Sequence, residues 1–343
     1  MHRMRDTAAV RRGEELDAAA LSKYLGTDVA IEQFPGGHSN LTYLIRTAER
    51  EMVLRRAPLG PVAPKAHDMA REYRVLEKIH PLFSAAPEVY LLCEDVSVIG
   101  AVFYLMERRE GVVVRDSVPP ELTRHKDYAA RASRAFLDTL VELHSIDIER
   151  NGLISVGKPE GFLERQVRGW ADRWRRAATE DSPGMERVIA WLADSPPVSG
   201  APSIVHNDYK LDNVMFHADD PGRIVAVLDW EMTTVGDPLA DLGLTLCYWT
   251  MGGASAAETM NWCSRDELIE RYAEKTGRDV SGIRYYEVLG IFKLAVIIQQ
   301  IYFRYVRGQT GDERFALFGE RVHGLIDRAS ALIAGGRSRA GSI

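Results

Sequence analysis

The 343-residue chain has few cysteines, no long apolar segment and no surplus of positive charge. Its three cysteines, Cys93, Cys247 and Cys263, are widely spaced, which excludes a disulfide framework or a zinc-ligand pattern and favours a reducing cytoplasm. The most apolar stretch, Val288 to Ile301, is interrupted by lysine and glutamine, so no membrane span is expected. A formal charge of −6 argues against a nucleic-acid partner bound through its phosphates.

The remaining composition, 46% hydrophobic and 27% charged, is that of a globular protein, and the length predicts two lobes or domains. Residues 1–12 are basic without the apolar core of a secretory signal, and we expect them to be disordered. Short strand-like runs split by turn residues predict the order β-β-β-α-β-β over residues 1–107. Helical periodicity dominates residues 108–343, around a small island of strands. The predicted fold class is α+β.

The most informative segment is HNDYKLDN, residues 206–213. Asp208 lies two residues after a histidine and five before Asn213, which is the spacing of a kinase catalytic loop. In such loops the aspartate takes the acceptor's hydroxyl proton and the asparagine holds a metal ion. Lys210 can reach a transferring phosphate from the same loop. Asp229 follows an apolar strand sixteen residues after Asn213, and these two hard oxygen ligands predict a Mg²⁺ site.

Together these motifs resemble the aminoglycoside phosphotransferase and choline kinase superfamily, a protein-kinase-like bilobal fold that phosphorylates small molecules. GGHSNLTY, VLRR, HNDYKLDN, LDWE and GDPLADLG occur in this order. They most resemble phosphotransferases related to the kinase domain attached to some acyl-CoA dehydrogenases, where arginine also replaces the phosphate-anchoring lysine. The resemblance implies a nucleotide-binding lobe at 1–107 and a catalytic and substrate lobe at 108–343.

The N-terminal lobe would bind the nucleotide. The turn PGGHSN could cover phosphates with the backbone of Gly36 and Gly37 and the hydroxyl of Ser39, although most two-glycine turns only reverse the chain. Val53 and Arg55 share one face of their strand, Val53 suited to the base and Arg55 to the phosphates. The strand ending YLMERREG resembles the hinge, where three residues would offer backbone groups to adenine: Met106, Glu107 and Arg108.

The sequence also predicts an ion pair for Arg55 and a helix cap at Asp237. Arg55 is expected to pair with Glu72 of the next helix, with solvated surface charges or an Arg56–Glu77 pair as the alternatives. In GDPLADLG, Asp237 is expected to cap a helix that begins at Pro238. The resemblance further implies that His206 and Asp241 support the loop structurally. It leaves open whether Glu231 contacts the metal ion.

The expected reaction transfers the γ-phosphoryl group of ATP, with Mg²⁺, to a hydroxylated small molecule. Only seven residues separate Asp229 from Asp237, too few for an activation segment that docks a protein substrate. An aminoglycoside would need a rim of carboxylates, but residues 244–343 carry 13 Arg+Lys against 11 Asp+Glu. A helical stripe of polar and cationic side chains favours a neutral or anionic hydroxyacyl-type acceptor instead: Lys293, Gln300, Arg304 and Arg307. The alternative is that this stripe faces solvent.

Three alternatives stay open at this point. One is an aminoglycoside 3′-type phosphotransferase. A second is a catalytically silent nucleotide-binding protein of the same fold, against which the intact Asp208, Asn213 and Asp229 argue. The third is a metal-dependent hydrolase that uses the HxD residues, although the nine histidines are scattered. ATP-dependent phosphorylation of a small molecule would exclude the last two.

Overall fold

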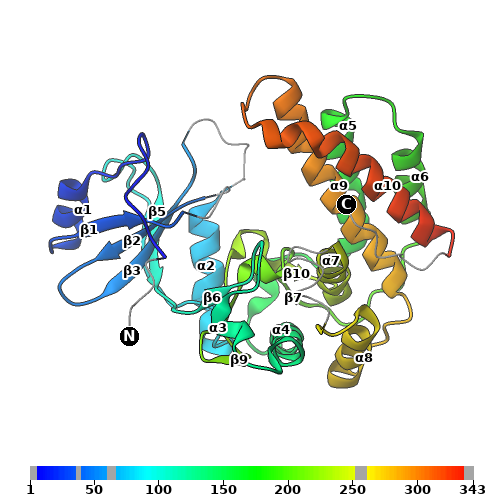
Figure 1. Ribbon diagram of the computed structural model, residues 1–343, viewed down its shortest axis with the longest axis horizontal. Coiled ribbons are helices and arrows are strands. Elements are labelled where there is room, and N and C mark those ends of the chain that lie inside the picture. Colours follow the sequence, from blue (N-terminus) through cyan, green and yellow to red (C-terminus); the bar gives the residue numbers. More distant parts are fainter. Residues whose placement is uncertain (1–5, 36–39, 60–66, 252–260, 336–343) are drawn as a thin grey trace. The chain divides into compact units, whose positions relative to one another are not determined.

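The structure is a computed structural model that describes residues 6–35, 40–59, 67–251 and 261–335 (Figure 1). The chain forms two compact units. Unit 1 comprises residues 1–111 and 224–233, and unit 2 comprises residues 112–223 and 234–343. The sequence predicts a single boundary at residue 107 and gives no sign that a ten-residue segment from the second half of the chain folds with unit 1.

Unit 1 is built on a five-stranded antiparallel sheet with the order β1-β2-β3-β5-β4. Its elements are β1 (Ala30–Gln33), β2 (Leu41–Arg46), β3 (Glu51–Arg56), α2 (Met69–Ile79), β4 (Val89–Cys93) and β5 (Phe103–Glu107), preceded by α1 (Ala18–Leu25). β2 and β3 pair along their whole length, with Leu41 opposite Arg56 and Arg46 opposite Glu51. The predicted meander and the order of strands and helix are confirmed.

Two helices cover opposite faces of this sheet. On one face Leu21 of α1 is fully buried in a cluster with Tyr43 and Phe103. On the other face α2 contacts β4 and β5, and the ring of Tyr73 meets the edge of Tyr104 at a centroid distance of 6.2 Å. Neighbouring strand residues alternate between the faces, so each helix buries one of the two alternating sets.

Unit 2 is mainly helical, with two small sheets of order β6-β8-β9 and β10-β7. Its elements are β6 (Val112–Val113), α3 (Pro120–Thr123), α4 (Tyr128–His144), α5 (Phe162–Ala177), α6 (Pro183–Asp194), β7 (Ser203–Val205), β8 (Val214–His217), the first half of β9 (Asp220–Val227), β10 (Thr234–Gly236), α7 (Pro238–Met251), α8 (Arg265–Thr276), α9 (Ile283–Val306) and α10 (Phe318–Ile333). The last four residues of β9 belong to unit 1. The predicted strand island is therefore two sheets.

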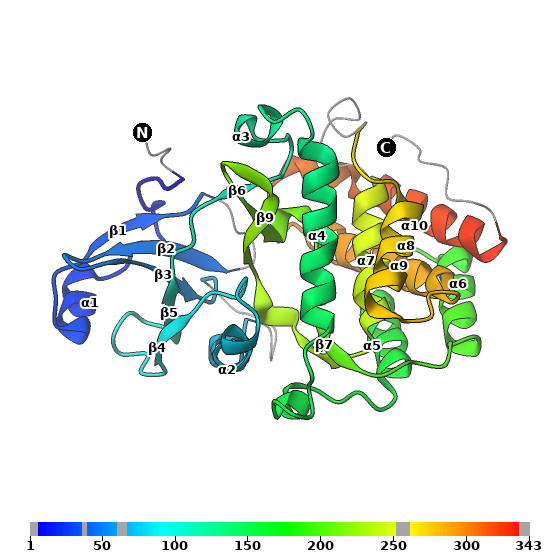
Figure 2. The same ribbon diagram turned by 90° about the horizontal axis from the view of Figure 1, so that it is seen from below.

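The helix α9 lies at the centre of unit 2, with α5, α7 and α10 packed around it (Figures 1 and 2). A Cβ atom on Gly243 of α7 would lie 2.3 Å from the backbone carbonyl carbon of Tyr286, so glycine lets the two helices approach closely. Among the described helices, α9 alone is long and apolar enough to cross a membrane, but 67% of its apolar window is buried inside the protein. That burial is what a core helix requires.

The segment that returns to unit 1 is firmly anchored there. The amide of Val227, at the end of β9, donates to the carbonyl of Ala85 over 2.8 Å. Trp230 is buried edge-on against Phe83, with ring centroids 5.9 Å apart, and its Nε1 donates to the Val227 carbonyl over 2.8 Å. These contacts fix the position of Asp229 within unit 1.

Candidate active site

The loop of residues 206–213 follows β7 in unit 2 and ends in a short 3₁₀ helix before β8. Three side chains converge on the carboxylate of Asp208. Its Oδ2 accepts a hydrogen bond from Asn213 Nδ2 at 2.8 Å and lies 2.9 Å from Lys210 Nζ. Its Oδ1 accepts a hydrogen bond from the hydroxyl of Tyr248 at 3.1 Å. The loop therefore brings the predicted residues Asp208, Lys210 and Asn213 together.

One face of α7 holds this loop. Asp241, Thr245 and Tyr248 lie four and three residues apart, which places them on one side of the helix. They bind four successive loop residues: the amides of His206 and Asn207 donate to Asp241, Thr245 donates to the carbonyl of Tyr209 over 2.9 Å, and Tyr248 donates to Asp208. Burial and the charge of Asp208 raise the pKa of Tyr248 well above its ordinary value, so its hydroxyl remains a donor.

Asp241 is itself supported by α4. His144, the last residue of α4, places Nε2 3.3 Å from Asp241 Oδ2 and Nδ1 2.8 Å from the hydroxyl of Tyr272. Burial lowers the pKa of His144. Burial would favour neutral Asp241, but hydrogen bonds from the His144 side chain and the His206 backbone amide outweigh it and lower the pKa of Asp241. Asp241 is thus a buried anion that braces the loop, in keeping with the support role implied by the resemblance.

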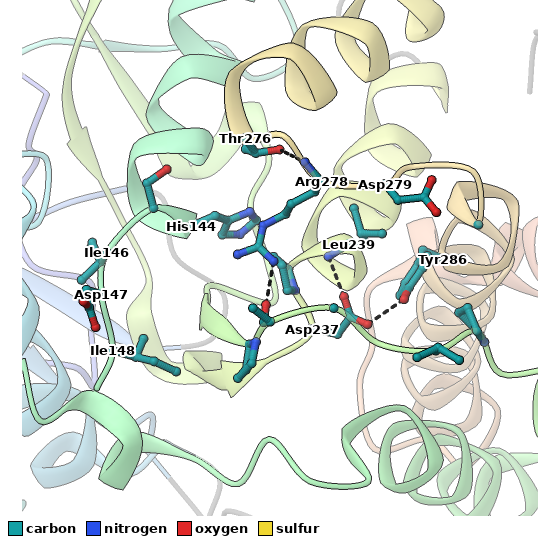
Figure 3. A pocket seen from close by; sticks show the side chains of 18 of the residues that line it. His144, Ile146, Asp147, Ile148, Asp237, Leu239, Thr276, Arg278, Asp279 and Tyr286 are labelled. Atoms are coloured by element: carbon teal, nitrogen blue, oxygen red, sulfur yellow. Dashed lines mark hydrogen bonds between the residues drawn. The ribbon is translucent and has the colours of Figure 1, made fainter. Parts of the chain in front are cut away.

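Asp237 lies at the start of α7, beside a pocket of about 780 Å³ in unit 2 (Figure 3). Its Oδ1 accepts a hydrogen bond from the amide of Leu239 at 3.0 Å, and its Oδ2 accepts one from the hydroxyl of Tyr286 at 2.6 Å. α7 begins at Pro238 as predicted. Both oxygens of Asp237 therefore serve the helix start and its packing against α9.

Unit 1 contains a buried ion cluster. Arg55 of β3 places Nη1 3.3 Å from Oε1 of Glu72 and Nη2 3.0 Å from Oδ1 of Asp229. The same Glu72 oxygen accepts a hydrogen bond from the amide of Trp230 at 3.1 Å. The pairing of Arg55 with Glu72 that the sequence predicts is present. Its connection to Asp229 was not foreseen, because it depends on the segment that returns to unit 1.

The protonation of this cluster follows from its burial. Burial raises the pKa of Glu72 to about 7; the positive charge of Arg55 opposes this shift, and the charges of Asp229 and Glu231 add to it. Burial alone would lower the pKa of Arg55, but Glu72 and Asp229 raise it well above its ordinary value, so the guanidinium stays charged. One cation is therefore shared between two carboxyl groups.

The backbone at Asp229 is unusual. Its φ of 67° lies in the left-handed region, which few residues other than glycine adopt. Two residues later, Oε2 of Glu231 accepts a hydrogen bond from Asn40 Nδ2 at 3.0 Å and lies 3.4 Å from Nδ1 of His67. In the sequence, Asn40 directly follows the segment GGHS. Protein groups therefore hold Glu231, whose contact with a metal ion the sequence left open.

The residues predicted to contact the base lie together on the sheet. Val53 of β3 is the cross-strand partner of Met106 of β5, and both side chains are nearly buried. Arg56 does not share the role of Arg55, because its Nη1 donates to the carbonyl of Ile99 over 3.2 Å.

The other residues predicted to contact the nucleotide either bind other protein groups or lie outside the described part of the chain. The amide of Glu107 donates to the carbonyl of Glu88 over 2.7 Å. The guanidinium of Arg108 pairs with Glu51 and, over 2.9 Å, with Asp6. The predicted phosphate-covering residues lie outside the described part of the chain: Gly36, Gly37 and Ser39.

The donor set predicted for Mg²⁺ is one carboxylate, Asp229, and one amide, Asn213. No group of three or more His, Cys, Asp and Glu side chains suited to a metal ion occurs among the described residues. Both Asn213 amide hydrogens are directed at Asp208, since Nδ2 donates to the carbonyl at 2.9 Å and to Oδ2 at 2.8 Å. Its Oδ1 is therefore turned away from Asp208. Such oxygen donors fit Mg²⁺, which commonly keeps water and phosphate as its other ligands.

Two polar residues around the loop were missed in the sequence, and a third, Lys293, was assigned to the acceptor stripe although it is buried beside the loop. Thr245 and Tyr248 lie in an apolar helix at positions i+4 and i+7 from Asp241, and this spacing was a usable signal. Lys293 interrupts the apolar core helix α9, which also marks it as unusual. Its contact with Asn207, described below, could not be found from spacing, because 86 residues separate the two.

The fold and the loop define a class of phosphotransferase, and comparison with known proteins agrees. The model of the Phosphotransferase enzyme family matches residues 30–286, and the chain belongs to this family. It is 33% identical to "Acyl-CoA dehydrogenase family member 11" of Gallus gallus over 95% of its own length. Since that match covers 44% of the chicken protein, the chain spans less than half of it. The likeness to proteins carrying an acyl-CoA dehydrogenase name agrees with the predicted subgroup.

Solved structures show the same fold. A candidate aminoglycoside phosphotransferase from Ralstonia eutropha JMP134 has a TM-score of 0.78 and 30% identity, covering 94% of this chain and all (100%) of that one. A thermostable variant of aminoglycoside phosphotransferase APH(4)-Ia, in a ternary complex with AMP-PNP and hygromycin B, has a TM-score of 0.60 and 17% identity, covering 94% and 99%. At that identity the second likeness concerns the fold alone.

Proposed function

We propose that this phosphotransferase transfers the γ-phosphoryl group of ATP to a hydroxyl group of a small acceptor. The observation that carries the proposal is the arrangement around Asp208. Oδ2 already receives contacts from Asn213 and Lys210, whereas Oδ1 receives one hydrogen bond from the described part of the chain, that of Tyr248. A carboxylate oxygen accepts two hydrogen bonds, so Oδ1 retains an acceptor position for the hydroxyl of a substrate.

Each named residue then has a defined task. Asp208 orients the acceptor hydroxyl and takes its proton, while Lys210, 2.9 Å from that carboxylate, stabilises the negative charge of the phosphoryl group in transfer. Arg55 anchors the α- and β-phosphates, and Val53 and Met106 contact the base. Charge stabilisation and positioning supply most of the catalysis in phosphoryl transfer.

Asn213 and Asp229 would hold Mg²⁺. When bound, the ion neutralises the phosphate oxygens and bridges them. Arg55 already lies 3.0 Å from Asp229, so the same carboxylate is shared between the phosphate anchor and the metal ligand set. The AMP-PNP bound by APH(4)-Ia supports an ATP-type donor.

For the acceptor we propose a neutral or anionic hydroxyacyl-type compound. The likeness to a protein carrying an acyl-CoA dehydrogenase name supports this choice. The predicted cationic stripe supports it only in part, because Lys293 is buried while Arg304 and Arg307 are exposed. The hygromycin B bound by APH(4)-Ia keeps an aminoglycoside as the second candidate.

The test is a phosphoryl-transfer screen of the purified chain with Mg²⁺ and γ-labelled ATP. The acceptors are hydroxyacyl thioesters, hydroxy acids and kanamycin-type aminoglycosides, and the Asp208→Asn variant is the blank. Turnover of a hydroxyacyl compound that the variant lacks supports the proposal. Efficient turnover of aminoglycosides alone would overturn the proposed acceptor, and label transfer to none of the library would overturn the reaction.

A further inference from the structure

Lys293 is a charged residue inside the core of unit 2 that the proposed reaction does not use. It lies in the middle of α9, and only 3% of its surface is exposed. Its Nζ lies 3.3 Å from Oδ1 of Asn207 and 5.7 Å from the ring centroid of Trp170 in α5. An ammonium group is rarely buried to this extent without a task, because burial removes its hydration.

Its partner Asn207 directly precedes the catalytic aspartate. Asn207 is 6% exposed and has a φ of 66°, in the left-handed region. Asparagine adopts this conformation more readily than most residues, but at a cost relative to glycine. The Asn207 amide donates to Oδ1 of Asp241 over 2.6 Å. Asp241 thus holds the backbone of Asn207, and Lys293 binds its side chain.

We propose that Lys293 is a positioning residue that holds Asn207 in its left-handed conformation and thereby directs Asp208. The left-handed residue turns the chain immediately before Asp208, so a change of its φ would reorient the carboxylate. The effect of Lys293 on turnover rests on the proposed function; its effect on the conformation of Asn207 does not.

The charges around Lys293 come from three elements. Burial lowers the pKa of Lys293 to about 8; Asp241 of α7 and Asp208 of the loop oppose this shift, and Arg173 of α5 adds to it. The net shift means that the buried site disfavours the ammonium form relative to water. A residue kept for packing alone would be better replaced by methionine, which has a similar length and no charge.

The first test compares crystal structures of the wild type and Lys293→Met. We expect Asn207 to leave the left-handed region, or its side chain to rotate away, and the Asp208 carboxylate to turn with it. This readout needs neither ATP nor an acceptor. An unchanged Asn207 and Asp208 in Lys293→Met would overturn the proposal.

The second test measures slow hydrolysis of MgATP, in which water takes the place of the acceptor. Lys293→Met should reduce kcat by about a hundredfold, as expected for a misplaced catalytic group, with KM for ATP changed less than about twofold because Lys293 acts through Asp208. Its Tm should not fall, since a buried charge is removed. The control is Gln299→Met on the same helix as Lys293. This variant loses buried hydrogen bonds to Ala177 and Thr179, and it should lower Tm but leave kcat unchanged.

Two further variants separate positioning from packing. Glycine adopts positive φ without a side-chain anchor, so Lys293→Met should lower kcat several-fold less in an Asn207→Gly background than in the wild type.

Wild-type kcat should fall as the pH rises through about 8, whereas Lys293→Arg, whose guanidinium stays charged, should not show that fall. Equal losses of kcat and Tm in both methionine variants would overturn the proposal. If the wild type hydrolyses no ATP and labels no acceptor of the screen while Asn207 moves in Lys293→Met, the proposed function fails and the positioning role stands.

Discussion

The two carboxylates to which the motifs assign the chemistry are held by different kinds of contact. In unit 2 Asp208 lies in a loop whose backbone is bound to α7, and its carboxylate accepts hydrogen bonds from Tyr248 and Asn213 and also pairs with Lys210. In unit 1 Asp229 belongs to a buried cluster in which Arg55 is shared with Glu72. Hydrogen bonds fix the direction of the Asp208 carboxylate, whereas Asp229 shares the cation of Arg55 with Glu72 and can exchange that contact for one with another cation.

This difference suits two tasks. A catalytic base must keep one orientation throughout the reaction, and α7 supplies that through three side chains at helical spacing. In the proposed reaction Asp229 binds the metal ion and Arg55 the phosphates, so this carboxylate must respond to the arrival of charged groups. The protein therefore separates a rigid carboxylate from an ion-responsive one, and variants of the two should fail in different ways.

The largest expected effect separates Asp208 from Asp229. Asp208→Asn should lower kcat by about 10²- to 10⁴-fold, because the lost group acts on the acceptor's proton, while MgATP binding stays close to that of the wild type. Asp229→Asn should weaken MgATP binding itself. Calorimetry with MgATP beside steady-state kinetics gives both quantities. Near-parental turnover in both variants would show that neither residue has the proposed role.

The next effect compares two neighbouring arginines of β3. Arg55→Ala leaves two carboxyl groups without their cation and should cost about 3–5 kcal/mol of stability, as breaking a buried ion pair does. It should also raise KM for ATP. Arg56→Ala loses hydrogen bonds to the carbonyls of Ala57 and Ile99 and is the matched control. Urea unfolding and ATP kinetics check both variants, and a larger rise of KM in Arg56→Ala would reverse the assignment.

The contrast between the two units also explains what could be predicted from the sequence. The strands of unit 1 and the loop of residues 206–213 are local patterns, and the predicted order β-β-β-α-β-β is the order observed. The partner of Arg55 followed from strand alternation and the apolar stripe of the next helix. Contacts that join distant segments left no periodic signal, as with Arg55 and Asp229, which are 174 residues apart. β10 was missed because three residues are too few to show a period.

The titration of Glu72 tests whether the unit 1 cluster is as buried as its contacts indicate. Its folded pKa of about 7 lies above the ordinary value of 4.5. The folded state therefore binds more protons than the unfolded state between these values. The resulting stabilisation is fully present below pH 4.5 and is lost as the pH rises through 7. Glu72→Gln should remove this slope from the free energy of unfolding, and identical slopes in both proteins would contradict the assignment.

The smallest expected effect concerns the hydroxyl of Tyr248, which tests whether the orientation of Asp208 depends on α7. Tyr248→Phe removes one hydrogen bond to Oδ1, worth about 1 kcal/mol, and should lower kcat a few-fold because the carboxylate gains freedom to rotate. Tyr285→Phe is the matched control, since its hydroxyl donates to the carbonyl of Leu192 over 2.8 Å, in the core. It should cost comparable stability without changing kcat. If both variants lowered kcat equally, general loosening of unit 2 would explain the loss, and Asp208 would owe its orientation to Asn213 and Lys210 instead of α7.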